Sequence, residues 1–192
     1  MSAGPAPRKT WTPEEYLAWE RRSPEKHEYF QGEIFAMTGA SRAHNKIVVN
    51  LGGELRSALR QRPCEVYTSD MRVKIPATGL YTYPDVVVVC CEPVFEQDAE
   101  LDTLLNPDVL FEVLSETTES YDRGRKFAQY RTLASLREYL LVSQGEALVE
   151  HYTREENGLW TFREHRAGGR VRLESIGCEV AVDEIYLKVL GG

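Results

Sequence analysis

The chain has 192 residues, a formal net charge of −7, and 42% apolar residues beside 28% charged ones. These values predict a soluble globular protein, and the length suits one domain with its own hydrophobic core. The acidic balance argues against a protein that wraps nucleic acid along a broad basic face, but it allows local contact at a site. No apolar run approaches the roughly 20 residues of a membrane span, and the N-terminus lacks the apolar region of a signal peptide. We therefore expect a cytoplasmic protein without membrane contact.

The four cysteines are Cys64, Cys90, Cys91 and Cys178, and no two of them form a C-x-x-C pair. Their spacing predicts neither a zinc ribbon nor a disulfide framework. We interpret all four as reduced, buried, small hydrophobic residues.

Residues 1–10 are predicted to be a disordered tail, and residues 11–192 a single domain. A helix is expected from Pro13, because Thr12 can cap it and Glu15 completes a capping box.

Gln31-Gly32 then indicates a hairpin turn between two short β-prone runs. Ser41 is the expected cap of a long helix over about residues 42–61, whose apolar residues recur at helical spacing before Pro63 stops it.

Strands are expected at residues 65–68, 70–75, 85–91, 109–114 and 139–142. Val86–Val89 is apolar without alternation, which predicts burial on both faces. The acidic segment from Glu92 to Asn106 is typical of a solvated connection. A further helix is expected from about Tyr121 to Leu133.

Asn157-Gly158 indicates a hairpin turn between strands at 148–153 and 159–164. A short strand at 170–173 and a final short helix at 182–186 complete the expected elements. Helices mixed with a partly parallel central sheet and antiparallel C-terminal strands predict an α/β architecture of mixed α+β character.

Two carboxylates stand where hydrophobicity alone would not place them. Asp85 follows Pro84 at the mouth of the Val86–Val89 run, and Glu112 lies inside the apolar strand, between Phe111 and Val113. A buried carboxylate costs several kcal/mol unless a cation or hydrogen-bond donors satisfy it. Asp85 also fits ordinary turn chemistry, and Glu112 also fits a buried salt bridge.

Lys126 is the third member of the constellation. Asp122, Lys126 and Tyr130 are spaced four residues apart, so one helix face carries all three. Two carboxylates can hold Mg²⁺ or Mn²⁺, and a lysine can orient the attacking water in phosphodiester hydrolysis. The same spacing also fits an Asp–Lys surface pair.

Together, the Pro84-Asp85 pair, the run Glu112-Val113-Leu114-Ser115 and the helix with Asp122, Lys126 and Tyr130 resemble the Uma-two family of restriction endonuclease-like proteins. That family belongs to the PD-(D/E)XK nuclease superfamily. The likeness extends over most of the chain, from Thr12 to Leu140. It implies a restriction endonuclease-like core, a mixed sheet flanked by helices with the site on adjacent strands.

The resemblance also implies that Asp85 and Glu112 bind the metal ion and that nucleic acid, expected to be DNA, is the substrate. The superfamily pattern places a lysine two residues after the glutamate, but that position holds Leu114. The resemblance implies that the catalytic lysine has moved to Lys126.

Four further residues are secondary candidates: Glu28, His44, Ser115 and Tyr130. Glu28 lies on the expected hairpin, where an exposed strand position is the simpler interpretation. His44, in the first turn of the long helix, could contact a phosphate or act as an acid or base. Ser115 could bind phosphate or cap the helix that follows it, and Tyr130 could contact the nucleic acid backbone.

The sequence therefore supports a Mg²⁺-dependent endodeoxyribonuclease with Asp85, Glu112 and Lys126 as catalytic residues. Two alternatives stay open. One is a non-catalytic interaction or nucleic-acid-binding protein on a degenerate nuclease fold. The other is a structural salt bridge between Glu112 and Lys126. Cleavage of both strands often uses a symmetric dimer, so a homodimer is the expected assembly.

Overall fold

The computed structural model describes residues 10–37, 39–97 and 102–190, so nearly all of the predicted disordered tail lies outside the described residues. Among these residues, no helix is both long and apolar enough to span a membrane. The helices are α1 (Pro13–Glu20), α2 (Arg42–Ala58), α3 (Glu119–Tyr121), a π-helical turn η1 (Asp122–Lys126), α4 (Phe127–Tyr130) and α5 (Val182–Ile185).

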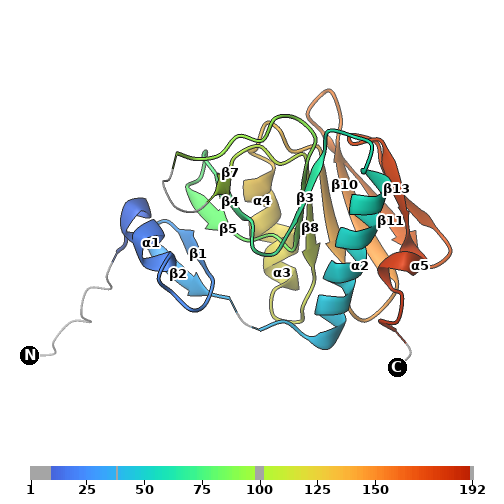
Figure 1. Ribbon diagram of the computed structural model, residues 1–192, viewed down its shortest axis with the longest axis horizontal. Helices are drawn as coiled ribbons and strands as arrows, with labels where there is room; N and C mark the ends of the chain where they lie inside the picture. Colours follow the sequence, from blue (N-terminus) through green and yellow to red (C-terminus); the bar gives the residue numbers. More distant parts are fainter. Residues whose placement is uncertain (1–9, 38, 98–101, 191–192) are drawn as a thin grey trace, which may run out of the picture.

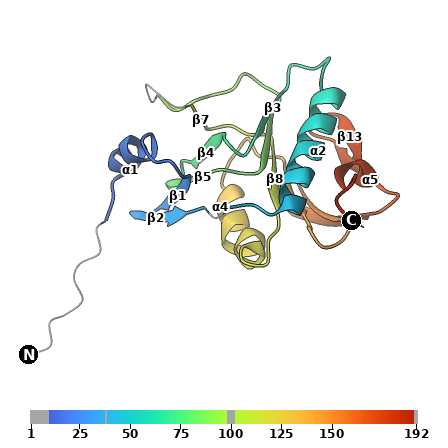
Figure 2. The ribbon, with the colours of Figure 1, turned by 60° about the horizontal axis from the view of Figure 1, so that its bottom comes forward.

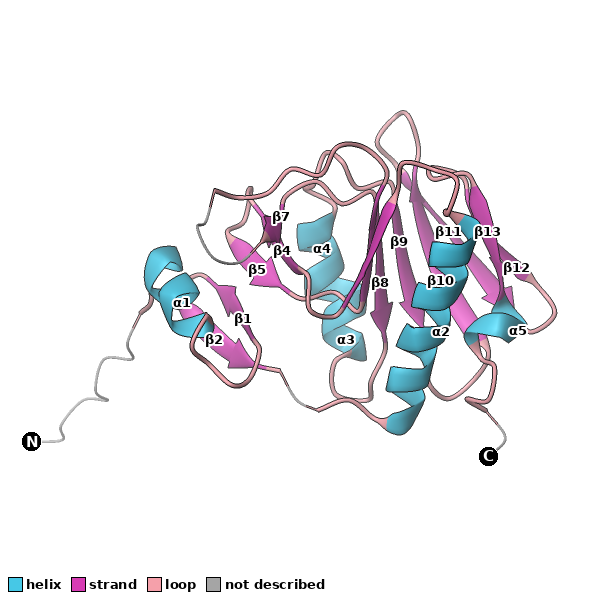
Figure 3. Cartoon of the chain, viewed as in Figure 1, coloured by secondary structure: helices cyan, strands magenta, loops and turns pink. Residues whose placement is uncertain are grey.

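The strands are β1 (His27–Phe30), β2 (Glu33–Ala36), β3 (Glu65–Thr68), β4 (Arg72–Ile75), β5 (Leu80–Thr82), β6 (Val86–Val89), β7 (Thr103–Leu104), β8 (Val109–Val113), β9 (Glu138–Val142), β10 (Leu148–Arg154), β11 (Trp160–Arg166), β12 (Arg170–Leu173) and β13 (Cys178–Ala181). Figure 3 shows how they are arranged around the helices.

The strands form a six-stranded sheet, a five-stranded sheet and a separate hairpin (Figure 1). The six-stranded sheet has the order β11-β10-β9-β8-β6-β3, and β8 and β9 are its parallel pair. The segment from α3 to α4 connects these two strands and lies over the sheet. The five-stranded sheet has the order β2-β1-β5-β4-β7, and β12 pairs with β13. The mixed α/β fold predicted from the sequence is confirmed.

The six-stranded sheet is buried on both faces. Helices α2 and α5 and the β12–β13 hairpin cover one face, where Val86 and Val88 join the core. The segment from α3 to α4 and strands β4 and β5 cover the other, where Val87 and Val89 pack (Figure 2). Every residue of β6 is therefore buried, as its unbroken apolar run predicts.

Local signals in the sequence placed several elements correctly. Thr12 caps α1 and forms the predicted capping box with Glu15. Gly32 adopts a positive φ of 87° in the β1–β2 turn, and Gly158 one of 82° in the β10–β11 turn. The side chain of Ser41 caps α2 by accepting a hydrogen bond from the backbone N–H of His44.

Other elements differ from the predictions. The connection before Asn106 contains the buried strand β7, which pairs in parallel with β4 through Thr103 and Leu104; residues 98–101 of that connection lie outside the described residues. The helix predicted over 121–133 is three short pieces that end at Tyr130. The sequence analysis also missed β5 and β13, because both are short and depend on pairing with distant strands.

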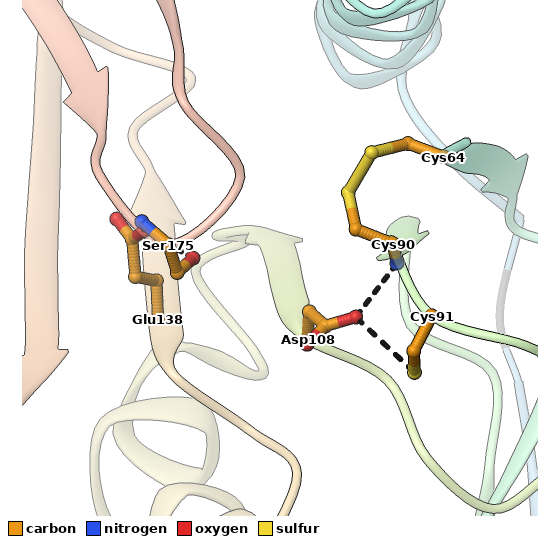
Figure 4. Close-up of a disulfide and its surroundings, with 6 residues drawn as sticks. All are labelled: Cys64, Cys90, Cys91, Asp108, Glu138 and Ser175. Atoms are coloured by element: carbon orange, nitrogen blue, oxygen red, sulfur yellow. Dashed lines mark hydrogen bonds between the residues drawn. A yellow bond between two sulfur atoms is a disulfide. The ribbon is translucent and has the colours of Figure 1, made fainter. Parts of the chain in front are cut away.

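The prediction for the cysteines was wrong. Cys64 and Cys90 form a disulfide across the β3–β6 pair, and Cys91 is exposed with a free thiol (Figure 4). The carboxylate of Asp108 accepts the backbone N–H of Cys90 at 2.7 Å and lies 3.9 Å from the Cys91 sulfur. The strand register brings together two cysteines that are 26 residues apart, so their spacing alone gave no sign of the pair.

We expect the Cys64→Ala/Cys90→Ala variant to lose about 3 kcal/mol of unfolding free energy, because the bond closes a loop in the unfolded chain. Urea denaturation would measure the loss, with Cys178→Ala as the control for removing a thiol that is not in the bond. Four titratable thiols in the native protein, together with unchanged stability of the double variant, would contradict the pairing.

Candidate active site

Asp85 and Glu112 meet at one end of the six-stranded sheet. Val86 pairs with Phe111 in the antiparallel β6–β8 ladder, so continuing the register places Asp85 opposite Glu112. The backbone N–H of Val113 donates to Asp85 Oδ2 at 2.7 Å and holds this carboxylate against β8. Side chains alternate along a strand, so Glu112 points to the face on which Leu110 packs beneath the α3–α4 segment. The two acids from the sequence prediction are therefore neighbours.

The Lys126 ammonium lies among carboxylates. Its Nζ is 2.9 Å from Glu112 Oε1, 3.1 Å from Glu28 Oε1 and 3.7 Å from Asp122 Oδ1. Lys126 is 5% exposed and Glu112 is 4% exposed, so this contact is shielded from bulk water. The carboxylates around this lysine come from the distant strand β1, from β8 and from η1 itself.

The lysine is carried by a π-helical turn. In η1 the backbone bonds run from residue i to i+5, a geometry that occurs mostly as single turns and often at functional sites. Asp122 and Lys126 are the buried residues of this turn, whereas Arg125 is exposed. The hydroxyl of Tyr139 donates to the backbone carbonyl of Asp122 at 3.2 Å and fixes the turn to β9. The prediction that Asp122 and Lys126 share a face is confirmed, although the turn is not α-helical.

The charges shift the acid–base behaviour of the pair. Burial raises the pKa of Glu112 to about 8, against the opposing effect of the Lys126 ammonium; Asp122 and Asp85 raise it further. Burial also opposes a charge on Lys126, but the carboxylates of Glu112 and Glu28 outweigh it and hold the lysine pKa well above its ordinary value. The surroundings thus favour the charged form of the lysine and make the Glu112 carboxylate easier to protonate than an exposed one.

Two of the secondary candidates contact these acids directly. His44 Nε2 lies 3.0 Å from Asp85 Oδ1, and its Nδ1 is buried without a hydrogen bond among the described residues. The hydroxyl of Tyr130 donates to Glu112 Oε1 at 2.7 Å. Each therefore orients one acid of the site.

Of the other two candidates, Glu28 is part of the site and Ser115 is not. Glu28 joins the site through Lys126 and accepts a hydrogen bond from the Thr82 hydroxyl. It is therefore not the exposed strand residue that the simpler interpretation expects. The Ser115 hydroxyl accepts the backbone N–H of Thr118 at 3.2 Å in the turn before α3, whose N-cap residue is Thr118 itself. No contact within the described part of the chain joins Ser115 to the acids.

Sequence reasoning undervalued Asp122, which is buried beside Lys126 rather than forming a surface pair. Burial raises the pKa of its carboxyl above the ordinary value. Sequence reasoning did not single out Tyr121. Burial, and after it the charge of Glu28, raises the pKa of Tyr121 to about 12. The spacing of Asp122 from Lys126 was the available signal for Asp122; Tyr121 had none.

The donor set suits a hard divalent ion, because carboxylate oxygens are the ligands that Mg²⁺ and Mn²⁺ prefer. The carboxylates of Glu28, Glu112 and Asp122 contact Lys126, and Asp85 lies beside Glu112 through its hydrogen bond with the Val113 N–H. Burial is the main reason for the raised pKa of Glu112, and the neighbouring carboxylates of Asp122 and Asp85 add to it. Within residues 10–37, 39–97 and 102–190, however, no three His, Cys, Asp or Glu side chains form a ready-made metal centre. The acids converge on the ammonium instead.

Comparison with known proteins places the chain in one family. A family model described as "Uma2: Putative restriction endonuclease" matches residues 13–183. The uncharacterized Synechocystis protein slr1290 is 42% identical over 94% of this chain and 94% of its own length. A second uncharacterized Synechocystis protein, sll1609, is 39% identical over 81% of this chain and 88% of its own length.

A crystal structure from Anabaena variabilis, described as "a putative nuclease", superposes with a TM-score of 0.72. It covers 92% of this chain and 98% of its own, at 18% sequence identity. At this identity the likeness shows the fold, which is that of a restriction endonuclease-like protein.

Lys126→Met should lower the unfolding free energy by about 3–5 kcal/mol, because it leaves buried carboxylates without their cation. Adding Glu112→Gln should restore part of that loss, so the two changes should be strongly non-additive in a double-mutant cycle. Chemical denaturation would measure the coupling.

Arg125→Met is the matched control, since Arg125 is an exposed cation of the same turn and should cost little. Additive effects of Lys126→Met and Glu112→Gln would show that the buried contact does not form in solution.

Proposed function

Because the chain belongs to the Uma2 family, we propose that it is a metal-dependent endonuclease that hydrolyses phosphodiester bonds in DNA. The observation that carries this proposal is the convergence of Asp85, Glu112 and Lys126 at one end of the sheet. A lysine that reaches the acids from a helix supplies the group missing at Leu114. Asp85, Glu112 and Lys126 are the catalytic residues in this proposal, and Glu28, His44 and Tyr130 position them.

Asp85 and Glu112 would hold the ion. The contacts of Glu112 with Lys126 and Tyr130 both use Oε1, so the other oxygen is the one to offer to a metal. Bound there, Mg²⁺ or Mn²⁺ would polarise the phosphate and lower the pKa of the attacking water. His44 and the N–H of Val113 keep the Asp85 carboxylate in place.

In this proposal, the Lys126 ammonium is the positive charge that the chain itself places at the site. Its ammonium is charged, shielded from water and fixed by Glu112, Glu28 and Asp122. A fixed cation in such surroundings offsets the charge that develops on phosphate oxygens more strongly than one in water. Glu112 must release its proton before it binds a cation, which couples the site to pH.

One observation favours a second candidate, a non-catalytic protein on the same fold. The Lys126–Glu112 contact already neutralises the buried acid, and the described residues contain no ready-made metal centre. A site that keeps this contact closed would bind no metal and would cleave nothing.

We expect plasmid and single-stranded DNA to be cleaved in the presence of Mg²⁺ or Mn²⁺ and to stay intact in EDTA. Asp85→Asn, Glu112→Gln and Lys126→Met should each lower the rate by at least about 100-fold, because each removes a charge from the reacting centre. Gel electrophoresis of timed reactions would measure the rates.

Arg125→Met, purified in the same way, should keep full activity. Equal activity in all these proteins would reveal a contaminating nuclease. Mn²⁺ binding without cleavage of DNA or RNA would favour the non-catalytic protein.

The affinity for Mn²⁺ should depend on pH. The pKa of Glu112 is raised to about 8 in the folded protein, so below that pH the ion must displace a proton. Affinity should therefore rise by up to about tenfold per pH unit as pH approaches about 8, and then level off. Calorimetric titration from about pH 6 to about pH 9 would measure this dependence.

Glu112→Gln should bind weakly and lose this pH dependence, whereas Glu174→Gln, at an exposed carboxylate, should keep it. A wild-type affinity that does not change with pH would exclude Glu112 as the titrating ligand.

A further inference from the structure

An exposed aromatic side chain lies beside the acid cluster. Phe35 is 46% exposed on β2, an edge strand of the five-stranded sheet. Its ring is an apolar surface in water, so a molecule that covered it would gain the free energy of burying that surface.

The strand register fixes where this ring lies. Phe35 pairs directly with Glu28 in the β1–β2 hairpin, and the neighbouring pair is Tyr29 with Ile34. Directly opposite residues point to the same face of a sheet, with Cβ atoms about 5 Å apart. Tyr29 and Ile34 pack against α1, so Glu28 and Phe35 occupy the opposite face.

Glu28 connects this face to the site. Its carboxylate contacts Lys126 Nζ at 3.1 Å, and Lys126 contacts Glu112 at 2.9 Å. Phe35 is thus the cross-strand neighbour of a residue that touches the candidate catalytic lysine. Tyr121, on α3, is half-buried, and the charges of the same cluster contribute to the raised pKa of its hydroxyl. The acids therefore have an aromatic residue near them on each of two separate elements, Phe35 on β2 and Tyr121 on α3.

We propose that Phe35 is a stacking platform for an unpaired base of the nucleic acid substrate. This inference rests on the proposed function, because it takes the phosphate to lie at the acid cluster. A base attached to that phosphate presents a flat aromatic face whose size suits an exposed ring, and stacking on that face does not depend on sequence. Phe35 carries no polar atom, so it selects an accessible base face rather than a particular base.

A stacking role for Phe35 requires a substrate with an unpaired base. Bases in an intact duplex are stacked on each other and offer no free face, so only a single strand or an unpaired base can use Phe35. The preferred substrate is therefore DNA with unpaired bases at the cleavage position. An intact duplex would still place its phosphates at the site but would gain nothing from the ring.

The experiment compares binding of a single-stranded oligonucleotide that carries 2-aminopurine with binding of its duplex, in Ca²⁺ and again in EDTA. Base stacking on Phe35 should quench the fluorescence of the single strand. Phe35→Ala should weaken single-strand binding by about 5- to 100-fold and abolish the quenching, with less than about twofold change for the duplex. Phe35→Trp should retain both binding and quenching.

Phe162→Ala is the matched control, because Phe162 is 51% exposed on β11, at the far edge of the other sheet. It should bind like the wild type. Phe35→Leu keeps an apolar side chain without a ring and should behave like Phe35→Ala, which separates stacking from general apolar contact. Circular dichroism would confirm that each variant is folded.

The outcomes distinguish this inference from the proposed function. Cleavage of DNA with unchanged single-strand binding in Phe35→Ala would overturn the stacking role and leave the nuclease intact. Quenching that depends on Phe35, without cleavage, would sustain the stacking role and reject the nuclease. Equal losses for single strand and duplex, or no binding by the wild type, would overturn the inference.

Discussion

The contact between the Lys126 ammonium and the Glu112 carboxylate is the constraint on which the site depends. Glu112 lies within a strand buried on both faces, where an unpaired charge would cost several kcal/mol. Two groups that fold onto that strand stabilise the carboxylate, namely the Lys126 ammonium and the hydroxyl of Tyr130. The sheet, the α3–α4 segment and the β1–β2 hairpin must therefore pack together for this acid to be tolerated.

The topology explains how a lysine on a helix can replace one on a strand. Leu114 follows Glu112 by two residues and so points to the same face, where it packs in the core. The α3–α4 segment crosses over between the parallel strands β8 and β9 and so must lie on a face of the sheet. It covers the face to which Glu112 points, and the π-helical turn directs Lys126 down onto the acid. The Lys126 ammonium thus reaches Glu112 from the helical layer and not from the strand itself.

The sequence predicted what local chemistry determines. The capping box at Thr12 and the glycine turns depend on neighbouring residues, and the burial of Val86–Val89 follows from composition. Glu112 could be singled out because an apolar strand makes its cost visible. Glu28 and Asp122 could not be ranked in the same way, because only tertiary contact with Lys126 buries them. The same holds for the Cys64–Cys90 bond and the π-helical turn.

The acidic charge of the chain limits how a polyanion can be held. With a net charge of −7 and three carboxylates in contact with Lys126, long-range attraction would contribute little to binding a polyanion such as DNA. Affinity for DNA would then have to come from short-range contacts, such as the metal ion proposed at Asp85 and Glu112. The proposed stacking on Phe35 would be another, and it requires no positive charge. In this proposal, a surface that cannot attract duplex DNA through its charge would select strands whose bases are exposed, because only these offer a base face that the Phe35 ring can bind.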